Sequence, residues 1–406
     1  MSAPAAPRWP IDPTVDRRQA LFKTAGYYAA FIALGLASAS LGPTLPGLAE
    51  STRSRVSEIS SLFAARSLGY LAGSLIGGRL YDRTPGHPVM VTGLLLMAAM
   101  MGLAPVVAQL WMLGAVILVL GFAEGALDVG GNTLLVWVHR DRVGPFMNAL
   151  HFFFGLGAFL SPLIIAHVLL RGGDMVRAYW TLALLLLPAA FWLLRLSSPI
   201  APRMPADMAA GQVNGRLVVL IVAFFFFYTG AEIAFGGWIY SYAVALRLSS
   251  DAVAAYLTST FWGALTLGRL LAVPLAVRFS SRSILLADCI GCLTSLATLL
   301  LGTHSMWTTF VGTCGVGLSM ASIFPAALSL AQGRMRITGQ VTGWFFVGAS
   351  AGGVVLPWLI GQFFESVGPH ATMVFLLVDI VVATGILAVL TFQSARPGYH
   401  GLTGER

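Results

Sequence analysis

The chain has 406 residues, of which 57% are hydrophobic and only 10% are charged. Soluble globular domains carry about 25% charged residues, so this composition excludes a soluble protein and indicates a polytopic membrane protein. The formal net charge is +8, but no basic run with interleaved aromatic residues suggests a nucleic-acid partner. The three cysteines lie in apolar segments, where we expect them to pack between helices rather than bind metal or form a redox pair.

Windows of about 20 apolar residues predict twelve membrane-spanning helices in this sequence. The first six are expected at residues 24–48, 58–80, 88–108, 111–138, 146–169 and 178–196. The other six are expected at residues 217–245, 252–277, 283–303, 306–331, 340–364 and 370–392. The expected fold class is therefore an all-α membrane protein built as two pseudo-symmetric six-helix bundles, residues 24–196 and residues 217–392.

The positive charges predict how the chain is oriented in the bilayer. Seventeen of the 24 Lys and Arg lie on the side of the N-terminal tail 1–23, the linker 197–216 and the C-terminal tail 393–406, and five lie on the other side. Because short cytoplasmic loops are enriched in Lys and Arg, we expect both tails and the linker in the cytoplasm and the protein in the plasma (inner) membrane. The tail 1–23 is polar and lacks the apolar core of a signal peptide.

The two halves of the sequence resemble each other. An offset of 199 residues superposes Gly69 and Arg79, at the end of the second predicted span, on Gly268 and Arg278, at the end of the eighth. Internal repeats of this kind are typical of transporters that bind their solute between two related bundles near the middle of the membrane.

The fourth predicted span carries Glu124, Asp128 and Asn132, spaced four residues apart, so they line one face of a helix. A carboxylate in the middle of a bilayer costs about 2.5–3.5 kcal/mol on insertion scales. Such residues usually mark a solute pathway or a proton relay; the alternative is a buried structural network between helices.

The residues expected within spans include more acids than bases. They are the acids Glu124, Asp128, Glu232, Asp288 and Asp379 and the bases Arg66 and Arg269. Even if both arginines form ion pairs, about three carboxyl groups must be protonated, bind a cation or reach water. This excess favours a cation-coupled transporter.

We assign roles to these residues from their positions. Asp128 is the first candidate for cation coupling, Glu232 is the second and Glu124 the third. Arg66 lies at a depth where it can pair with Glu124.

Near the cytoplasmic end of neighbouring spans, Arg269 and Asp288 are expected to form a packing ion pair. Asp379, in the last span, has no assigned role.

Recognition of a sugar needs hydrogen-bonding groups for hydroxyls and aromatic faces for the ring. The candidates are Asn132, Asn148, His151, Trp238, Trp262 and Trp344. Each aromatic residue alone is more often a packing or lipid-facing residue, and His151 fits a solute contact and a helix contact equally well.

The loop after the second span reads GGRLYDRTPGH, residues 77–87, and resembles the signature G-x-L-a-D-r-x-G-r of the major facilitator superfamily. The resemblance implies a fold of two six-helix bundles that exposes a central site alternately to each side. It also implies that Gly78, Asp82 and Arg83 belong to a gate at the cytoplasmic face.

Further stretches narrow the resemblance to the fucose:proton symporter and sodium-dependent glucose transporter branch. They are DVGGN at 128–132, NALHFFFGLGA at 148–158, GAE at 230–232 and SIFP at 322–325. The fucose symporters carry an acidic residue in their first helix, whereas residues 27–48 contain none. The proton relay of those symporters therefore does not carry over as a whole.

Together these features predict a secondary active transporter that moves a small polar solute, most simply a hexose, by symport with H⁺ or Na⁺. We expect a monomer with no cofactor and no bound metal other than the co-transported ion. The sequence contains no phosphate-binding loop that would indicate an ATP-driven pump and no catalytic triad that would indicate an enzyme. Two alternatives remain: a proton-coupled drug or metabolite exporter of the same fold, and a membrane receptor that does not transport.

Overall fold

A computed structural model describes residues 17–199, 215–248, 250–302, 305–332, 334–335 and 339–392. Most of the tail 1–23, most of the linker 197–216 and all of the tail 393–406 lie outside the described residues. Within the described part, 12 helices are long and apolar enough to cross a membrane. The all-α, twelve-helix fold class is confirmed.

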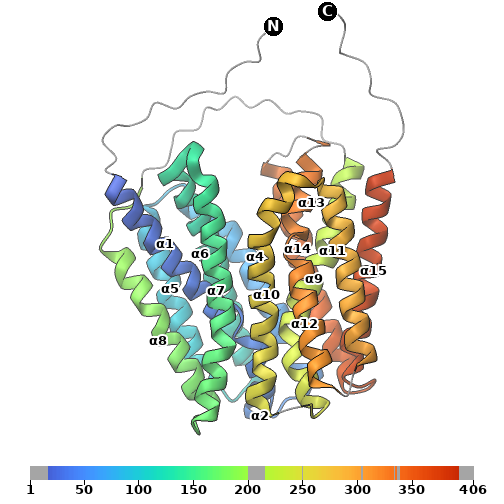
Figure 1. The fold of residues 1–406 in the computed structure, drawn as a ribbon. Helices are drawn as coiled ribbons and strands as arrows, with labels where there is room; N and C mark the ends of the chain where they lie inside the picture. Colours follow the sequence, from blue (N-terminus) through green and yellow to red (C-terminus); the bar gives the residue numbers. More distant parts are fainter. Residues whose placement is uncertain are drawn as a thin grey trace, which may run out of the picture.

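The helices form two groups that stand side by side (Figure 1). The first group consists of α1 (Arg17–Ser38), α2 (Leu41–Thr52), α3 (Val56–Ile59), α4 (Ser61–Tyr81), α5 (Gly86–Leu103), α6 (Leu110–His139), α7 (Val143–Leu170) and α8 (Met175–Leu194). The second group consists of α9 (Gly215–Ala245), α10 (Asp251–Arg278), α11 (Ser281–Leu301), α12 (Met306–Met320), α13 (Ile323–Gln332), α14 (Gly339–Phe364) and α15 (His370–Phe392). Two 3-10 turns, Ala104–Val106 and Arg140–Arg142, join helices of the first group. We call the face at which α1 begins and α15 ends the upper face, as drawn in Figure 1, and the opposite face the lower face.

Two of the spans are broken within the membrane, and both breaks have the same cause. The first lies between α1 and α2 and the second between α12 and α13. Pro43 and Pro325 each occupy the third position of the helix that follows the break. A proline has no N–H to offer the carbonyl four residues earlier, so the helix cannot continue through Ala39 or Ala321. Gly42, Pro43 and Pro46 interrupt the first predicted span, so its break can be expected from the sequence, whereas no break was expected in the tenth span.

Side chains from neighbouring helices satisfy carbonyls that the breaks release. Arg66 of α4 donates from Nη1 to the carbonyl of Ser38 at 2.7 Å. Tyr228 of α9 donates its hydroxyl to the carbonyl of Met320 at 3.0 Å. Irregular backbone at this depth is tolerated only where protein or water satisfies it, so these two contacts support the broken spans.

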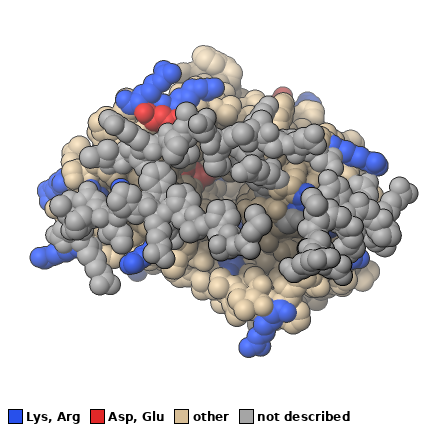
Figure 2. All heavy atoms as spheres, turned by 90° about the horizontal axis from the view of Figure 1, so that it is seen from above, with Lys and Arg blue, Asp and Glu red and all other residues tan. Residues whose placement is uncertain are grey.

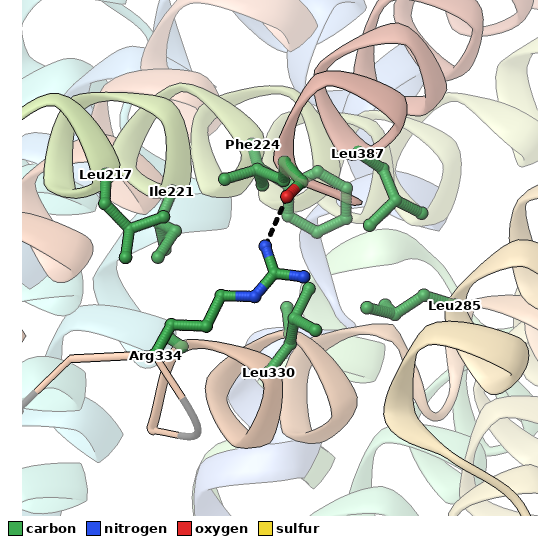
Figure 3. A pocket seen from close by; sticks show the side chains of 10 residues that line it. Leu217, Ile221, Phe224, Leu285, Leu330, Arg334 and Leu387 are labelled. Carbon is green, nitrogen blue, oxygen red and sulfur yellow. Dashed lines mark hydrogen bonds between the residues drawn. The ribbon is translucent and has the colours of Figure 1, made fainter. Parts of the chain in front are cut away.

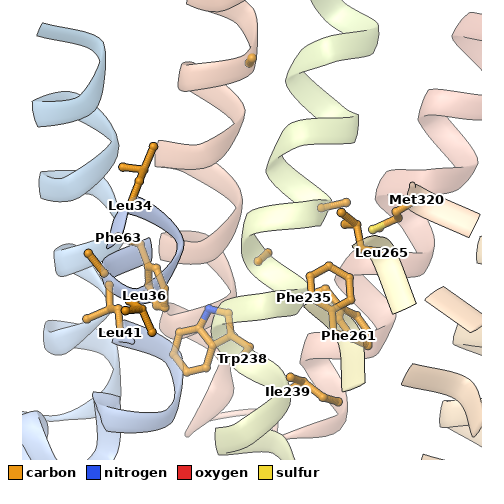
Figure 4. Packing of buried hydrophobic residues seen from close by; sticks show 14 of the residues in the cluster. Leu34, Leu36, Leu41, Phe63, Phe235, Trp238, Ile239, Phe261, Leu265 and Met320 are labelled. Atoms are coloured by element: carbon orange, nitrogen blue, oxygen red, sulfur yellow. The ribbon is translucent and has the colours of Figure 1, made fainter. Parts of the chain in front are cut away.

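The two groups are in direct contact at the lower face. Gln362 of α14 donates to the carbonyl of Ser57 at 2.8 Å, and the backbone N–H of Val56 donates to Glu365 at 2.9 Å. Above these contacts α7 and α10 pack closely, since a Cβ on Gly155 would lie 2.0 Å from Oγ1 of Thr266. Large apolar side chains of both groups, including Phe63 and those around α9 and α10, fill this region (Figure 4).

Arginine and lysine side chains surround the rim of the upper face, and the space-filling view shows a shaded hollow near its middle (Figure 2). Grey residues, which are not described, lie across part of this view. The two groups therefore meet at the lower face and leave a recess that opens toward the upper face.

Candidate functional site

An ion pair within the first group connects three helices. Arg66 of α4 donates from Nε and Nη2 to the two carboxylate oxygens of Glu124 on α6, at 2.8 and 2.6 Å. The side chain of Arg66 is 16% exposed and that of Glu124 is 2% exposed. Because Arg66 also binds the carbonyl of Ser38, this pair fixes the broken first span against α4 and α6.

One turn closer to the upper face, Asp128 of α6 has neutral partners only. The hydroxyl of Tyr70 on α4 donates to its Oδ2. The side-chain amide of Asn132 donates to its Oδ1 at 3.0 Å. Asp128 is partly exposed, and no arginine, lysine or histidine among the described residues forms a salt bridge with it. A carboxylate in this position needs a proton or a cation to balance its charge.

The second group holds a different carboxylate arrangement. Nη2 of Arg269 on α10 lies 3.5 Å from Oε1 of Glu232 on α9. Their side chains are 28% and 14% exposed. Tyr228, one turn before Glu232, interacts electrostatically with the same carboxylate and arginine.

This arrangement corrects the expected pair of Arg269 and Asp288. Asp288 instead accepts a hydrogen bond of 2.6 Å from the hydroxyl of Ser322, beside the break between α12 and α13. Arg269 and Asp288 do lie on consecutive helices, but the rotation of α10 turns the guanidinium toward α9.

Two expected solute contacts, His151 and Trp262, lie near the boundary between the groups. His151 of α7 packs edge-on against Phe31, with ring centroids 6.1 Å apart, and the charge of Arg269 acts on it from the other group. Trp262 of α10 lies edge-on to Phe154 of α7 at 6.2 Å. Its indole N–H is buried and has no acceptor among the described residues.

The sequence-family model of the Major Facilitator Superfamily matches residues 27–357. The chain belongs to the major facilitator superfamily. Among curated proteins, sodium-dependent glucose transporter 1 of Xenopus laevis is 32% identical over 356 residues, spanning 80% of this chain and 72% of the relative. The human protein of that name is 30% identical over 407 residues, spanning 90% and 78%. Human major facilitator superfamily domain-containing protein 4A is 26% identical over 489 residues, spanning 94% of both chains.

Solved structures confirm the major facilitator fold. A mutant of the nucleoside transporter NupG superposes with a TM-score of 0.73 at 13% identity, covering 91% of this chain and 99% of that one. A bacterial homologue of the human lysosomal transporter Spinster, in an inward-facing and unoccupied conformation, superposes with a TM-score of 0.70 at 9% identity, covering 92% and 96%. At these identities the similarity concerns the fold alone.

The structure places the residues of the superfamily loop at the upper end of α4. Asp82 follows the last residue of α4, and both Asp82 and Arg83 are exposed. Asp82 forms no ion pair with any described residue. Gly77 makes a close helix contact, since a Cβ there would lie 2.9 Å from the Cα of Ala126, and the gate role expected of Gly78 stays a prediction.

Two of the three tryptophans expected to contact solute, Trp238 and Trp344, differ in exposure. Trp238 is fully buried, donates its indole N–H to the carbonyl of Pro357 at 3.0 Å and stacks on Phe364 (Figure 4). It therefore packs between helices in this structure, and its expected contact with solute stays a prediction. Trp344 is 53% exposed near the start of α14. Asn148, one turn before His151, is exposed near the upper end of α7.

Two further features of the second group lie away from the central residues. Asp379 of α15 is 4% exposed, and neither of its carboxylate oxygens has a partner among the described residues. Arg334 extends into a small apolar pocket beside Leu217, Leu330 and Leu387 and donates to the carbonyl of Leu390 (Figure 3). The guanidinium of Arg334 is bound at a helix end, and no carboxylate lines the pocket. This pocket therefore does not resemble a sugar site.

Sequence reasoning missed two partners of the central carboxylates, Tyr70 for Asp128 and Arg269 for Glu232. The internal repeat marks the positions of both residues. Tyr70 directly follows Gly69 and Arg269 directly follows Gly268, the two glycines that the offset of 199 residues superposes.

Proposed function

We propose that this transporter carries a hexose together with Na⁺ and that Asp128 is the group that binds the cation. The observation that carries the proposal is the environment of Asp128. Tyr70 and Asn132 give its carboxylate hydrogen bonds, but no positive charge among the described residues balances it. A cation that enters with the solute can supply that charge.

The neighbouring oxygen atoms suit an alkali cation. Hard cations prefer carboxylate, amide carbonyl and hydroxyl oxygens. The amide of Asn132 uses its nitrogen to contact Asp128, which leaves its oxygen available, and the hydroxyl oxygen of Tyr70 is adjacent. The similarity to proteins named sodium-dependent glucose transporter 1 supports Na⁺ over H⁺ and a hexose over other polar solutes.

The other acids inside spans suit this role less well. Glu124 and Glu232 each face an arginine. Asp288 and Asp379 belong to α11 and α15, which pack against helices of the second group. Among these acids, Asp128 combines partial exposure, neutral oxygen neighbours and a position on α6 close to α1 and α7.

The contacts between the groups support transport by alternating access. The groups are joined at the lower face, and the recess opens toward the upper face (Figure 2). The excess of Arg and Lys on the upper side supports a cytoplasmic location for that face. In this assignment the structure is open to the cytoplasm, and Asp82 forms no ion pair with any described residue in this state.

An uptake panel in proteoliposomes tests the proposal. Labelled glucose is supplied with and without an inward Na⁺ gradient at fixed pH, and with and without a pH gradient in the absence of Na⁺. We expect accumulation only with the Na⁺ gradient. Accumulation driven by the pH gradient alone would replace Na⁺ by H⁺, and extrusion of the solute against an inward proton gradient would favour the exporter.

A further inference from the structure

The contact between Glu232 and Arg269 leaves most of the guanidinium unused. Arginine has five N–H donors, and among the described residues Arg269 uses one, at 3.5 Å. Arg66, in contrast, makes three hydrogen bonds of 2.6 to 2.8 Å. A charged donor at this depth that lacks protein acceptors must face water or a ligand.

The position of Arg269 on α10 directs it toward the boundary between the two groups. Trp262, Thr266 and Arg269 are spaced four and three residues apart and share one helix face. Thr266 meets Gly155 of α7 on this face, and Trp262 meets Phe154 of the same helix. The free donors of Arg269 therefore lie where a solute between the bundles can reach them.

We propose that Glu232 and Arg269 together bind neighbouring hydroxyl groups of a neutral sugar and that Glu232 excludes sugar acids. This inference rests on the proposed sugar transport. The guanidinium donates to two adjacent hydroxyl oxygens, and the carboxylate accepts a hydrogen bond from a hydroxyl. A sugar hydroxyl can both donate and accept, so the two charged groups can be satisfied by the same diol.

Charge balance explains why the pair selects a neutral solute. Glu232 and Arg269 compensate each other, so a neutral sugar adds no charge to the membrane interior. A hexuronate would place a second carboxylate beside Glu232, and one negative charge would remain unpaired, which is costly at this depth. Without the charge of Glu232, Arg269 would instead offer a carboxylate a two-pronged hydrogen-bonded contact.

Counterflow in proteoliposomes tests this inference, because exchange without an ion gradient reports solute binding separately from coupling. Labelled glucose and labelled glucuronate are compared in the wild type and in Glu232→Gln. We expect the wild type to prefer glucose strongly. In Glu232→Gln the preference should fall by at least about tenfold, the effect typical of one charged hydrogen bond.

Arg269→Gln should weaken exchange of glucose by about 10- to 100-fold without admitting glucuronate. Since this variant leaves Glu232 unpaired, the double variant Glu232→Gln with Arg269→Gln provides a neutral pair in case the single variant does not fold. The double variant should lose glucose exchange and gain none of glucuronate. Asp288→Asn, which changes a carboxyl group of the same bundle that bonds Ser322, is the matched control and should keep the wild-type preference.

The outcomes separate this inference from the proposed function. If the wild type exchanges glucose but Glu232→Gln keeps the wild-type preference, the assignment of the pair is overturned and sugar transport stands. If the wild type exchanges neither sugar, the proposed transport of hexose is overturned and the assignment of the pair falls with it.

Discussion

The two halves of the molecule carry different residues at equivalent positions. Tyr70 and Arg269 each follow a glycine of the internal repeat, and each contacts a carboxylate on a neighbouring helix. Tyr70 gives Asp128 a hydroxyl, whereas Arg269 gives Glu232 a positive charge. The first half thus keeps a carboxylate without a counter-charge, and the second half keeps a balanced pair.

This difference separates two tasks that a symporter must perform. A carboxylate without a counter-charge has an energetic need for a cation, so it suits coupling. A balanced pair has no such need but retains hydrogen-bonding capacity, so it suits a neutral solute. The ion pair of Arg66 and Glu124 suits both tasks less well, because three donors of Arg66 and both carboxylate oxygens of Glu124 are used within the protein.

Comparison of the two ion pairs predicts the largest effect on stability. Arg66→Gln leaves Glu124 buried without a counter-charge and releases the carbonyl of Ser38, so we expect a loss of about 3–5 kcal/mol. Arg269→Gln should lose less, about 1–3 kcal/mol, because the contact with Glu232 is longer, at 3.5 Å, and both side chains are more exposed. Unfolding of the purified protein in detergent, followed by tryptophan fluorescence, measures both. Equal losses in the free energy of unfolding would contradict this difference between the two ion pairs.

Replacing Tyr70 by arginine, the residue type at the equivalent position 269, tests the comparison of the two halves in a transport assay. Tyr70→Arg should give Asp128 a permanent counter-charge and reduce Na⁺-driven accumulation by about 100-fold, equivalent to roughly 2.7 kcal/mol. Exchange of labelled glucose across the membrane without a gradient should remain. Tyr70→Phe, which keeps the ring and removes the hydroxyl, is the control and should retain accumulation with weaker Na⁺ dependence. Full coupling in Tyr70→Arg would contradict the role given to Asp128.

Asp379 should show the smallest effect. Its carboxyl group has no partner among the described residues, and it lies on α15, away from the boundary between the bundles. We expect Asp379→Asn to transport glucose within about twofold of the wild type and to change stability by no more than about 1 kcal/mol, because a neutral amide replaces a buried carboxyl group that lacks a counter-charge. Uptake kinetics and the same unfolding assay measure these quantities. Loss of coupling in this variant would move the cation site to the second bundle.

The sequence predicted the spans well because the thickness of a bilayer imposes long apolar segments. The last span was expected at residues 370–392, and α15 covers His370–Phe392. The break in the tenth span was missed, although Pro325 carries its physical cause. Within a span of high overall hydrophobicity, one proline does not reveal whether the helix kinks or stops.

The site was less predictable than the fold. Spacing showed that Glu124 and Asp128 share one helix face, and the structure places an arginine opposite only the first. Spacing cannot give the rotation of one helix relative to another, so it assigned Arg269 to Asp288 instead of Glu232. It also cannot distinguish a tryptophan at a solute site from one in a packed interface, such as Trp238 beside Phe364.

Asp128→Asn provides the most direct test of the central claim, that Asp128 couples the cation to the solute. The variant keeps the shape of the side chain and its contacts with Tyr70 and Asn132 but removes the charge. We predict that Na⁺-driven accumulation of glucose is abolished while glucose counterflow is partly retained. Driven accumulation at the wild-type level would contradict the account and show that another group binds the cation.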